Sequence, residues 1–453
     1  MLRSRKSFRW AFVVTVTLAA ALLWPGVYRG MTDSRETTYE GLKIFSDVIE
    51  LIQKNYVDEV DSKKLIEDAI QGMVGSLDPH SSLLTPEAFK ELQIDTQGEF
   101  TGIGIHITMR DNMVTVISPI EGTPAYHAGI KANDKITKID AQPTENLADA
   151  VKRMRGPKGT KVVITVLREG EANPLDFDLV RDLIPIHSVK AIVLEPGYGY
   201  VWVTHFRENT YDDLVRALNA LEEGQPNLKG LVLDLRDNPG GVLDQAIRIS
   251  DLFLESGVIM TSKGRLKRHT RIYNANKDDA KPRTYPMVVL INGGSASASE
   301  IVAGALQDHK RALILGTTSF GKGSVQSIEN LRDGYAVKLT IARYYTPSGR
   351  SIQAKGVEPD IVVPQQIVTA AAEQSRRLKE RDLANHLDSG LAPEAKPETQ
   401  KNTPNPEPPA ETAPVPNPRT GPLKAEELKK DNQIQRALDI LISHDIFQNR
   451  QNG

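Results

Sequence analysis

The spacing of apolar residues near the N-terminus predicts helices. Apolar positions recur in steps of three and four from Tyr39 to Tyr56, so they share one helical face. A second helix is expected over Lys63–Met73, and a third begins at Thr85, after the turn LDPHSS at residues 77–82. Residues 31–95 are therefore expected to form a helical region that serves packing or dimerisation.

The pattern then changes to short β segments separated by glycine turns. Met113–Ile120, Asp134–Asp140 and Lys161–Gly170 fit a small, partly open barrel, with one helix expected at Leu147–Met154. These elements predict a separate β domain over residues 96–185.

Residues 186–365 alternate apolar strands with amphipathic helices. The strands are YGYVWVTHF, LKGLVLDL and YPMVVLING, and the helices that follow them are YDDLVRALNALEE, GVLDQAIRISDLFL and SASEIVAGALQD. This alternation is typical of βαβ units around a largely parallel sheet. Ligand chemistry on such sheets gathers at the carboxyl ends of the strands, so candidate catalytic residues are sought there.

The first 30 residues have the layout of an export signal. Four basic residues precede the apolar run Trp10–Tyr28, and a buried core helix would not carry basic residues on one flank only. The run is short for a membrane span, which needs about 20 residues, so a cleaved signal and a retained membrane anchor both stay open. We expect export to the periplasm or cell envelope, with possible anchoring to the inner membrane.

The C-terminal part contains a proline-rich stretch. A helix is expected after Pro364, and residues 392–424 hold ten of the chain's 27 prolines. Residues 366–425 are therefore interpreted as a helix and an extended linker. Residues 426–453 are expected to form a final helix that docks on its own chain or on a second protomer. Its apolar stripe consists of Ile434, Leu438, Leu441 and Ile442.

Composition excludes several function classes. The 453 residues suffice for two or three domains, and 40% hydrophobic residues are enough for real cores. A net charge of -2 without a basic stripe argues against nucleic-acid binding. The absence of cysteine excludes disulfides, zinc-thiolate sites and a cysteine nucleophile. The nine histidines show neither HExxH nor helical ligand spacing, which disfavours a metalloprotease.

Two strand ends carry candidate chemistry. In VVLINGGSASASE an apolar strand ends in glycines, and a helix begins within the serines. A serine there would meet free backbone N–H groups that can stabilise an oxyanion, although an ordinary helix cap explains it equally well. In LVLDLRDNPGG the glycines would let backbone amides approach a substrate carbonyl, or would simply form a tight turn.

Lys322 lies between two glycines in FGKGSVQ, just after a short apolar strand. As a general base, Lys322 would need its pKa lowered by roughly three units from the usual value. The alternative is an exposed lysine in a turn, whose pKa need not be shifted. Gly316–Lys322 also spells GxxxxGK, but a phosphate-binding loop requires Ser or Thr immediately after the lysine, followed by a helix. Gly323 follows instead.

The segment FTGIGIHI, followed by GTPAYHAGIKANDKITKIDAQP, resembles a bacterial PDZ domain. In that family the glycine loop presents backbone N–H groups to a peptide's terminal carboxylate, while the peptide adds a strand to the sheet. The loop here would be Gly102, Ile103, Gly104 and Ile105. Taken alone, GIGI could also be a glycine-bulged strand.

The motifs together resemble the carboxyl-terminal processing (tail-specific) serine protease family over about residues 40–365. They are KNYVDEVDSKKLIEDAI, SLDPHSS, LDLRDNPGG, SASASE, FGKGSVQ and ARYYTPSGRSIQAKGVEPDIVVP. The resemblance implies an α/β multidomain chain, in which a crotonase-like αβ-spiral protease core accompanies the PDZ domain, the N-terminal helical segment and the C-terminal helix. It implies cleavage of exported proteins near their C-termini, with no cofactor.

Site roles follow from the same resemblance. The middle serine, Ser297, would be the nucleophile, Lys322 the general base and Gln326 the residue that orients the lysine. Backbone groups of Gly240 and Ala298 would bind the oxyanion. The flanking Ser295 and Ser299 would be structural.

The PDZ domain of this family recruits substrate C-termini and gates the active site. Arg168 is a candidate for coupling the two domains, although a solvated arginine at a strand end explains it equally well. Homo-oligomers, as dimers or larger rings, and helical-repeat envelope adaptors are common in the family and are expected partners here.

Two rival functions stay open from sequence. His309 could serve a Ser-His-Asp hydrolase, but twelve helical residues would hold it about 18 Å from Ser297. A catalytically silent PDZ scaffold in the cell envelope is the non-enzymatic alternative.

Overall fold

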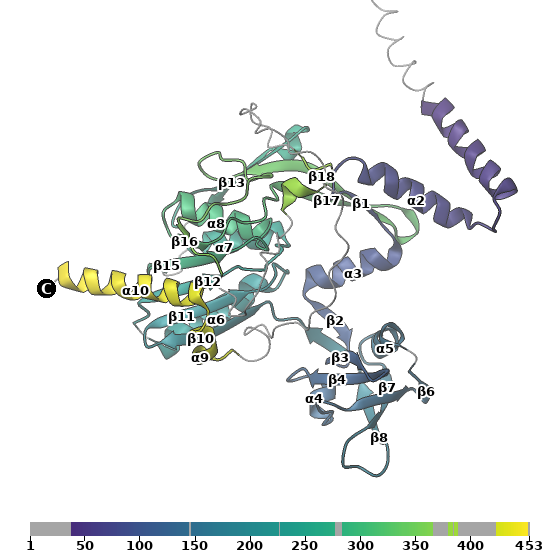
Figure 1. The fold of residues 1–453 in the computed structure, drawn as a ribbon, viewed down its shortest axis with the longest axis horizontal. Helices are drawn as coiled ribbons and strands as arrows, with labels where there is room; N and C mark the ends of the chain where they lie inside the picture. The colour runs from purple at the N-terminus through teal and green to yellow at the C-terminus, as the bar shows by residue number, and fades with distance from the viewer. Residues whose placement is uncertain are drawn as a thin grey trace, which may run out of the picture. The chain divides into compact units, whose positions relative to one another are not determined.

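The structure, a computed structural model, describes residues 38–144, 146–225, 227–276, 283–365, 379–383, 385–387 and 423–451 (Figure 1). The expected leader, the helix after Pro364 and nearly all of the proline-rich stretch lie outside these ranges. Within them, no helix has both the length and the hydrophobicity of a membrane span. Contacts divide the chain into two units, Met1–Gly75 and Ser76–Gly453.

The described part of the first unit is helical. Residues 38–55 form one helix and α2 spans Ser62–Gly75, which confirms both predictions. Leu42 and Phe45 are 62% and 40% exposed, so the apolar stripe that predicts the first helix faces solvent.

The first helix of the second unit is α3 (Pro86–Gln97), which begins as predicted: the Thr85 hydroxyl caps it by accepting a hydrogen bond from the N–H of Ala88. The chain then enters a two-stranded ladder of β2 (Glu99–Gly102) and β9 (Asp182–Pro185). The strands of the small β domain lie between β2 and β9 in the sequence.

The small domain is a six-stranded β-sheet with a buried apolar cluster of its own. The sheet order is β3-β4-β5-β7-β8, with β6 beside β5. The bounds are β3 Ile105–Arg110, β4 Met113–Pro119, β5 Lys135–Ile139, β6 Gln142–Pro143, β7 Lys161–Leu167 and β8 Leu175–Val180. Short α4 (Pro124–His127) and α5 (Leu147–Met154) complete it, and α5 has the predicted bounds. Because β3 ends the sheet, no described strand pairs with its outer edge.

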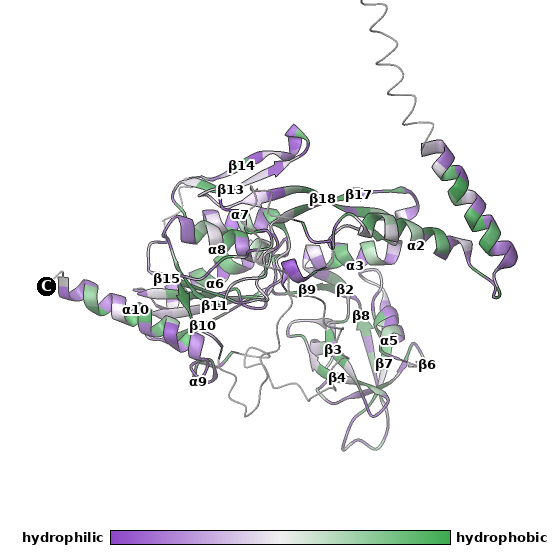
Figure 2. Cartoon of the chain, turned by 45° about the horizontal axis from the view of Figure 1, so that its top comes forward, coloured by the Kyte–Doolittle hydropathy of each residue, from purple (hydrophilic) through white to green (hydrophobic). Residues whose placement is uncertain are grey.

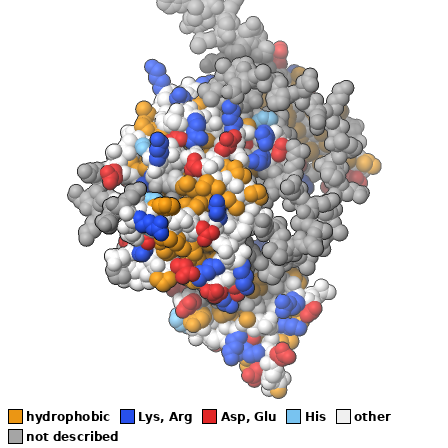
Figure 3. Space-filling view, turned by 60° about the vertical axis from the view of Figure 1, so that its left-hand side comes forward, with side chains coloured by type: hydrophobic (Ala, Val, Ile, Leu, Met, Phe, Trp, Pro, Cys, Tyr) orange, Lys and Arg blue, Asp and Glu red, His pale blue; other side chains and the backbone are white. Residues whose placement is uncertain are grey.

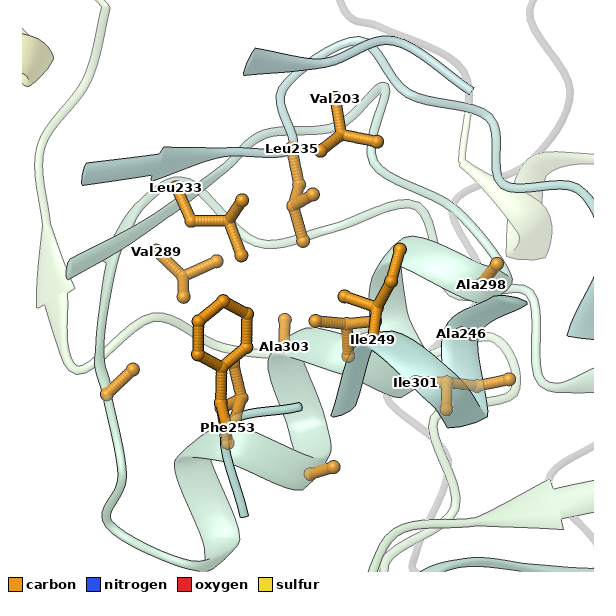
Figure 4. Packing of buried hydrophobic residues seen from close by; sticks show 14 of the residues in the cluster. Val203, Leu233, Leu235, Ala246, Ile249, Phe253, Val289, Ala298, Ile301 and Ala303 are labelled. Carbon is orange, nitrogen blue, oxygen red and sulfur yellow. The ribbon is translucent and has the colours of Figure 1, made fainter. Parts of the chain in front are cut away.

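The larger domain contains the predicted sheet, which is parallel except at its first strand pair. Its order is β10 (Val189–Glu195), β11 (Tyr198–Val203), β12 (Gly230–Asp234), β15 (Met287–Ile291), β16 (Leu313–Gly316) and β19 (Ile361–Val362). Helices α6 (Thr210–Gly224), α7 (Leu243–Asp251) and α8 (Ala298–Asp308) follow β11, β12 and β15. Leu233 and Val289 of the sheet belong to one buried cluster with Ile249 of α7 and Ala303 of α8, all labelled in Figure 4, so these two helices cover one apolar face.

A second sheet, wholly antiparallel, was not predicted. It contains β1 (Ser82–Leu84), β13 (Gly257–Gly264), β14 (Arg271–Ala275), β17 (Ser324–Asn330) and β18 (Ala336–Tyr345). Strand β18 pairs with β1, β13 and β17, and so joins segments far apart in sequence. This sheet flanks the segment that carries Lys322.

The C-terminal helices dock on their own chain. Helices α9 (Ala425–Leu428) and α10 (Asn432–Gln451) lie beside the parallel sheet, on the face opposite α7 and α8 (Figure 1). Figure 2 shows apolar and polar residues sharing α10. Ile434, Leu438 and Leu441 are buried against sheet residues, which answers the docking question that the sequence leaves open.

Candidate active site

Ser297 lies at the N-terminus of α8, where the sequence predicts it. It is the N-cap residue, with φ 52° and ψ -110°, a backbone conformation that a residue with a Cβ rarely adopts. Its side chain is partly exposed and, in the part of the chain described, makes no cap hydrogen bond. A serine with a strained backbone at a helix N-terminus is a candidate nucleophile, and its backbone N–H also takes part in a capping box with Glu300.

Lys322 lies between β16 and β17 and is partly buried. Burial lowers the pKa of its amine below the usual value, and the positive charge of Lys338 lowers it further. The carboxylates of Glu380, Glu300 and Asp78 act in the opposite direction. The net lowering is the direction that a general base requires.

Two buried side chains hold the backbones of Ser297 and Lys322 together. The Glu300 Oε2 atom accepts hydrogen bonds from the N–H of Ser297 (2.8 Å) and the N–H of Lys322 (2.9 Å). The Tyr344 hydroxyl lies 3.0 Å from the carbonyl oxygen of Ser297 and 2.7 Å from that of Lys322, and its single hydrogen is shared between the two acceptors. We call Glu300 and Tyr344 the dyad clamp, since each of them contacts both predicted catalytic residues.

Glu300 is itself an unusual carboxylate. Its Oε1 atom accepts from the Gly321 N–H (2.8 Å) and the Ser319 hydroxyl. Burial raises the pKa of this carboxyl to about 7, although all four hydrogen bonds favour its ionised form. Sequence reasoning missed this residue, yet the spacing Ser297-x-x-Glu300 is the capping-box pattern and could have indicated it.

The glycine turn after β12 contacts the nucleophile directly. Gly240 has φ 98°, and a Cβ there would lie 2.7 Å from the Ala296 carbonyl oxygen and 2.9 Å from the Ala298 nitrogen. The Ser299 hydroxyl donates to the Asn238 carbonyl (2.9 Å) and stitches the two loops together, as expected of a structural serine.

The backbone donors of this site are unevenly occupied. The N–H of Gly240 donates to the Asn238 side chain (2.9 Å). The N–H groups of Ala298 and Gly241 have no acceptor among the described residues. Two free donors therefore remain beside Ser297.

Gln326 lies on β17, and its amide donates to the hydroxyls of Ser324 (2.9 Å) and Thr340 (3.4 Å). The Thr340 hydroxyl in turn donates to Asp78 (3.1 Å). Among the described residues no hydrogen bond joins Gln326 to Lys322, so its orienting role stays a prediction.

A cleft of about 290 Å³ opens at this site. The predicted residues Ser297, Ala298, Gly240 and Gln326 all line it, together with Lys338. Apolar side chains form another part of its wall: Leu92, Val242, Leu243, Ile301 and Val325. The cleft can therefore accept an extended chain with an apolar side chain beside the serine.

The PDZ loop has the geometry of a carboxylate site. Gly104 has φ 79°, and a Cβ there would collide with the Thr123 side chain at 2.3 Å. Ile103 is buried, and Ile105 begins the edge strand β3. The N–H groups of Ile103 and Gly104 lie outside both flanking strands, with no acceptor in the described ranges. Gly102 ends β2.

Arg168 is held inside the β domain. Its guanidinium donates to both oxygens of Asp134 (2.8 and 2.7 Å) and to the Gly129 carbonyl (2.8 Å), and the Asp134 bond raises its pKa. The proposed coupling to the larger domain would require this ion pair to open.

The geometry disfavours two rival sites. A strand, β17, follows Lys322, where a phosphate-binding loop needs a helix. His309 ends α8, and its imidazole contacts the Val258 carbonyl (2.7 Å). In the described residues no three potential metal ligands cluster.

Comparison with known proteins identifies the family. Peptidase family S41 matches residues 197–363, the PDZ domain matches 101–179, and the N-terminal domain of the activating protease CtpB matches 26–88. A carboxy-terminal-processing protease of Bartonella bacilliformis is 47% identical over 83% of this chain and 87% of its own length. The chain belongs to the carboxyl-terminal processing protease family. The predicted family, enzyme class and fold class are confirmed.

Other relatives agree. A carboxyl-terminal-processing protease of Synechocystis is 36% identical over 80% of this chain and 89% of its own. The solved photosystem II D1 C-terminal processing protease is 31% identical, covers 71% of this chain and 92% of its own, and has a TM-score of 0.41. The family and domain matches make the chain a serine peptidase with a PDZ domain, whose substrates are peptide chains.

Proposed function

We propose that the protein is a serine endopeptidase that uses a Ser297–Lys322 dyad. The dyad clamp carries this proposal, because Glu300 and Tyr344 bond the backbones of precisely those two residues. The Glu300 bond to the Ser297 N–H alone would be part of an ordinary capping box, so the argument rests on the bonds that the same two side chains also make to Lys322.

In the proposed mechanism Lys322, as a free amine, takes the Ser297 proton while Oγ attacks the scissile carbonyl carbon. The oxyanion would be bound by the Ala298 N–H and by the Gly240–Gly241 turn, where the Gly241 N–H has no acceptor among the described residues. The lysine then gives the proton to the leaving amine. Water, activated by the same amine, hydrolyses the acyl-enzyme, so the chemistry needs no cofactor. Gln326 would orient the lysine.

We further propose that the PDZ domain binds the substrate C-terminus and gates the dyad. The free N–H groups of Ile103 and Gly104 support carboxylate binding, and the open edge of β3 supports addition of a peptide strand. Exported envelope proteins are the proposed substrates because the N-terminal sequence resembles an export signal. The exposed apolar stripe of residues 38–55 supports a homo-oligomer or an envelope adaptor as partner.

The test compares cleavage of an unstructured protein by wild type, Ser297→Ala and Lys322→Ala. Each substitution should lower kcat by at least about a thousandfold, because nucleophile and base act as one unit. Ser327→Ala and Lys310→Ala are matched controls outside the cleft lining, and should retain activity. Equal activity in all five proteins would refute the dyad. An inactive wild type that binds C-terminal peptides would favour the silent scaffold.

A further inference from the structure

The C-terminal segment 423–451 has no assigned role in catalysis. It lies beyond the residues matched by the peptidase family, the PDZ domain and the N-terminal domain. Nevertheless it packs closely on the catalytic sheet: a Cβ on Gly230 in β12 would lie 3.1 Å from Leu441 of α10. The contact between this segment and the turn next to the active site lies at the start of α10, beside the end of β12.

Arg236 follows β12 and is fully buried. Its Nε and Nη2 atoms donate to Asp234, with the shortest distance 2.7 Å, and its backbone N–H donates to the same carboxylate (2.9 Å). The Tyr200 hydroxyl also donates to Asp234 (2.7 Å). The Asp234 carboxylate is thus fully engaged and satisfies only one side of the guanidinium.

The C-terminal segment satisfies the other side. Nη1 of Arg236 donates to both oxygens of Asp431 (3.1 and 2.9 Å) and to Oε1 of Gln433 (2.6 Å). Asp431 also accepts from the N–H groups of Gln433 (2.9 Å) and Ile434 (3.2 Å), so it caps α10. One carboxylate therefore fixes both the helix and the arginine.

Arg236 stands four residues before Gly240, in a turn that is bonded to the nucleophile loop. Asp237 and Asn292 exchange two hydrogen bonds of 3.0 Å. The carbonyl of Leu235, the residue before Arg236, accepts a hydrogen bond from the Ser295 hydroxyl (2.8 Å). A displacement of Arg236 would therefore reach the glycine turn and the loop that carries Ser297.

We propose that Asp431 and Gln433 are positioning residues of the active site, which act through Arg236 on the oxyanion turn. The inference rests on the proposed function for its catalytic consequence, but its structural basis is independent of the dyad. Without Asp431, a buried guanidinium nitrogen loses its carboxylate, and the buried donor must find a new partner by moving. The turn would then lose its alignment while the sheet stays folded.

The experiment uses full-length variants. Asp431→Ala is compared with Leu441→Ala, which weakens docking of α10 without touching Arg236, and with Lys429→Ala, which removes a peripheral pair with Glu195 (2.6 Å). Thermal melting, kcat, KM and hydrogen–deuterium exchange of the peptide covering residues 234–242 are measured. We expect Asp431→Ala to lower kcat about tenfold with KM within twofold, equivalent to about 1.4 kcal/mol, and to accelerate exchange in the turn.

The controls separate positioning from general stability. Leu441→Ala should lower the melting temperature at least as much as Asp431→Ala, yet leave kcat and turn exchange near wild type below its melting range. Asp431→Asn retains an acceptor oxygen and a good helix cap. It should therefore keep most of the wild-type kcat and most of the protection of the turn against exchange. Unchanged exchange in Asp431→Ala, or equal changes in Leu441→Ala, would overturn the proposal. Activity that survives Ser297→Ala would refute the dyad instead, and the exchange data would still decide the role of Asp431.

Discussion

The lowered pKa of Lys322 is the net result of opposing contributions, several of them from residues far apart in sequence. Burial is the largest contribution, and the positive charge of Lys338 on β18 adds to it. Against these act the carboxylates of Glu380, Glu300 and Asp78. Glu380 is itself buried, and His80 contacts its carboxylate at 2.7 Å. The base strength of Lys322 can thus be tuned in both directions by single substitutions around it.

We predict that Lys338→Gln and Glu380→Gln shift the pH–rate profile in opposite directions. Loss of the Lys338 charge raises the pKa of Lys322, so less free amine is present at neutral pH and the ascending limb moves to higher pH. Loss of the Glu380 charge lowers this pKa and moves the limb to lower pH. The two shifts should therefore have opposite signs, because the two partner charges are opposite. The measurement is kcat/KM against pH, which reports the base of the free enzyme.

Lys267→Gln is the matched control, because it removes an exposed cation that does not contribute to the pKa of Lys322. Its profile should coincide with that of wild type. Shifts of the same sign in Lys338→Gln and Glu380→Gln would contradict the assignment of Lys322 as the base.

At the scale of elements, two loops from neighbouring parallel strands meet at Ser297. Strand β12 leads to the glycine turn and β15 to the start of α8, and the loops are stitched by the Ser299–Asn238 bond. The face that Figure 3 shows has lysine and arginine side chains interspersed with acidic ones, without a basic stripe.

Sequence patterns located these loops but not what supports them. Continuous apolar strands followed by glycines reveal β12 and β15, and they placed Ser297 and Gly240 together. The strand β18 is only partly buried along its length, so its periodicity gives a weak signal, and the contacts of Tyr344 arise only from tertiary pairing. Arg236 and Asp431 are 195 residues apart, a separation that no local pattern bridges.

We predict that Gly240→Ala lowers kcat by about a hundredfold, the scale of losing an oxyanion donor. The added methyl would lie 2.7 Å from the Ala296 carbonyl oxygen and 2.9 Å from the Ser297 Cβ, so the turn must withdraw. Gly349→Ala is the control: φ is 83° there, but the methyl meets open space. Gly349→Ala therefore adds backbone strain without a steric clash, and its kcat should stay near that of wild type. Steady-state kinetics at matched folded fractions check this, and equal losses in both variants would show that strain, not crowding at Ser297, is responsible.

At the scale of the whole second unit, the PDZ domain and the cleft share α3 and the β2–β9 ladder. Leu92 of α3 lines the cleft, and β2 follows α3 and leads directly into the glycine loop. The Arg207 guanidinium, beside the cleft, donates to Asp95 of α3 (2.8 Å). A peptide that moves the PDZ loop thus has a short covalent path to the cleft, which gives the proposed gating a physical basis.

The PDZ loop would recognise the free carboxylate at the substrate's C-terminus. Because two free N–H groups in the PDZ loop would bind a carboxylate with charge-assisted hydrogen bonds, wild type should cleave a free-acid substrate with a KM about tenfold below that of its C-terminal amide. Gly104→Ala should abolish this difference, since its methyl would collide with Thr123 and distort the loop. Gly122→Ala is the matched control, with φ 77° and open space around the methyl, and should preserve it. Equal KM values for the free acid and the amide in wild type would show that the PDZ loop does not recognise the terminal carboxylate. The dyad is tested separately, so this result would not contradict it.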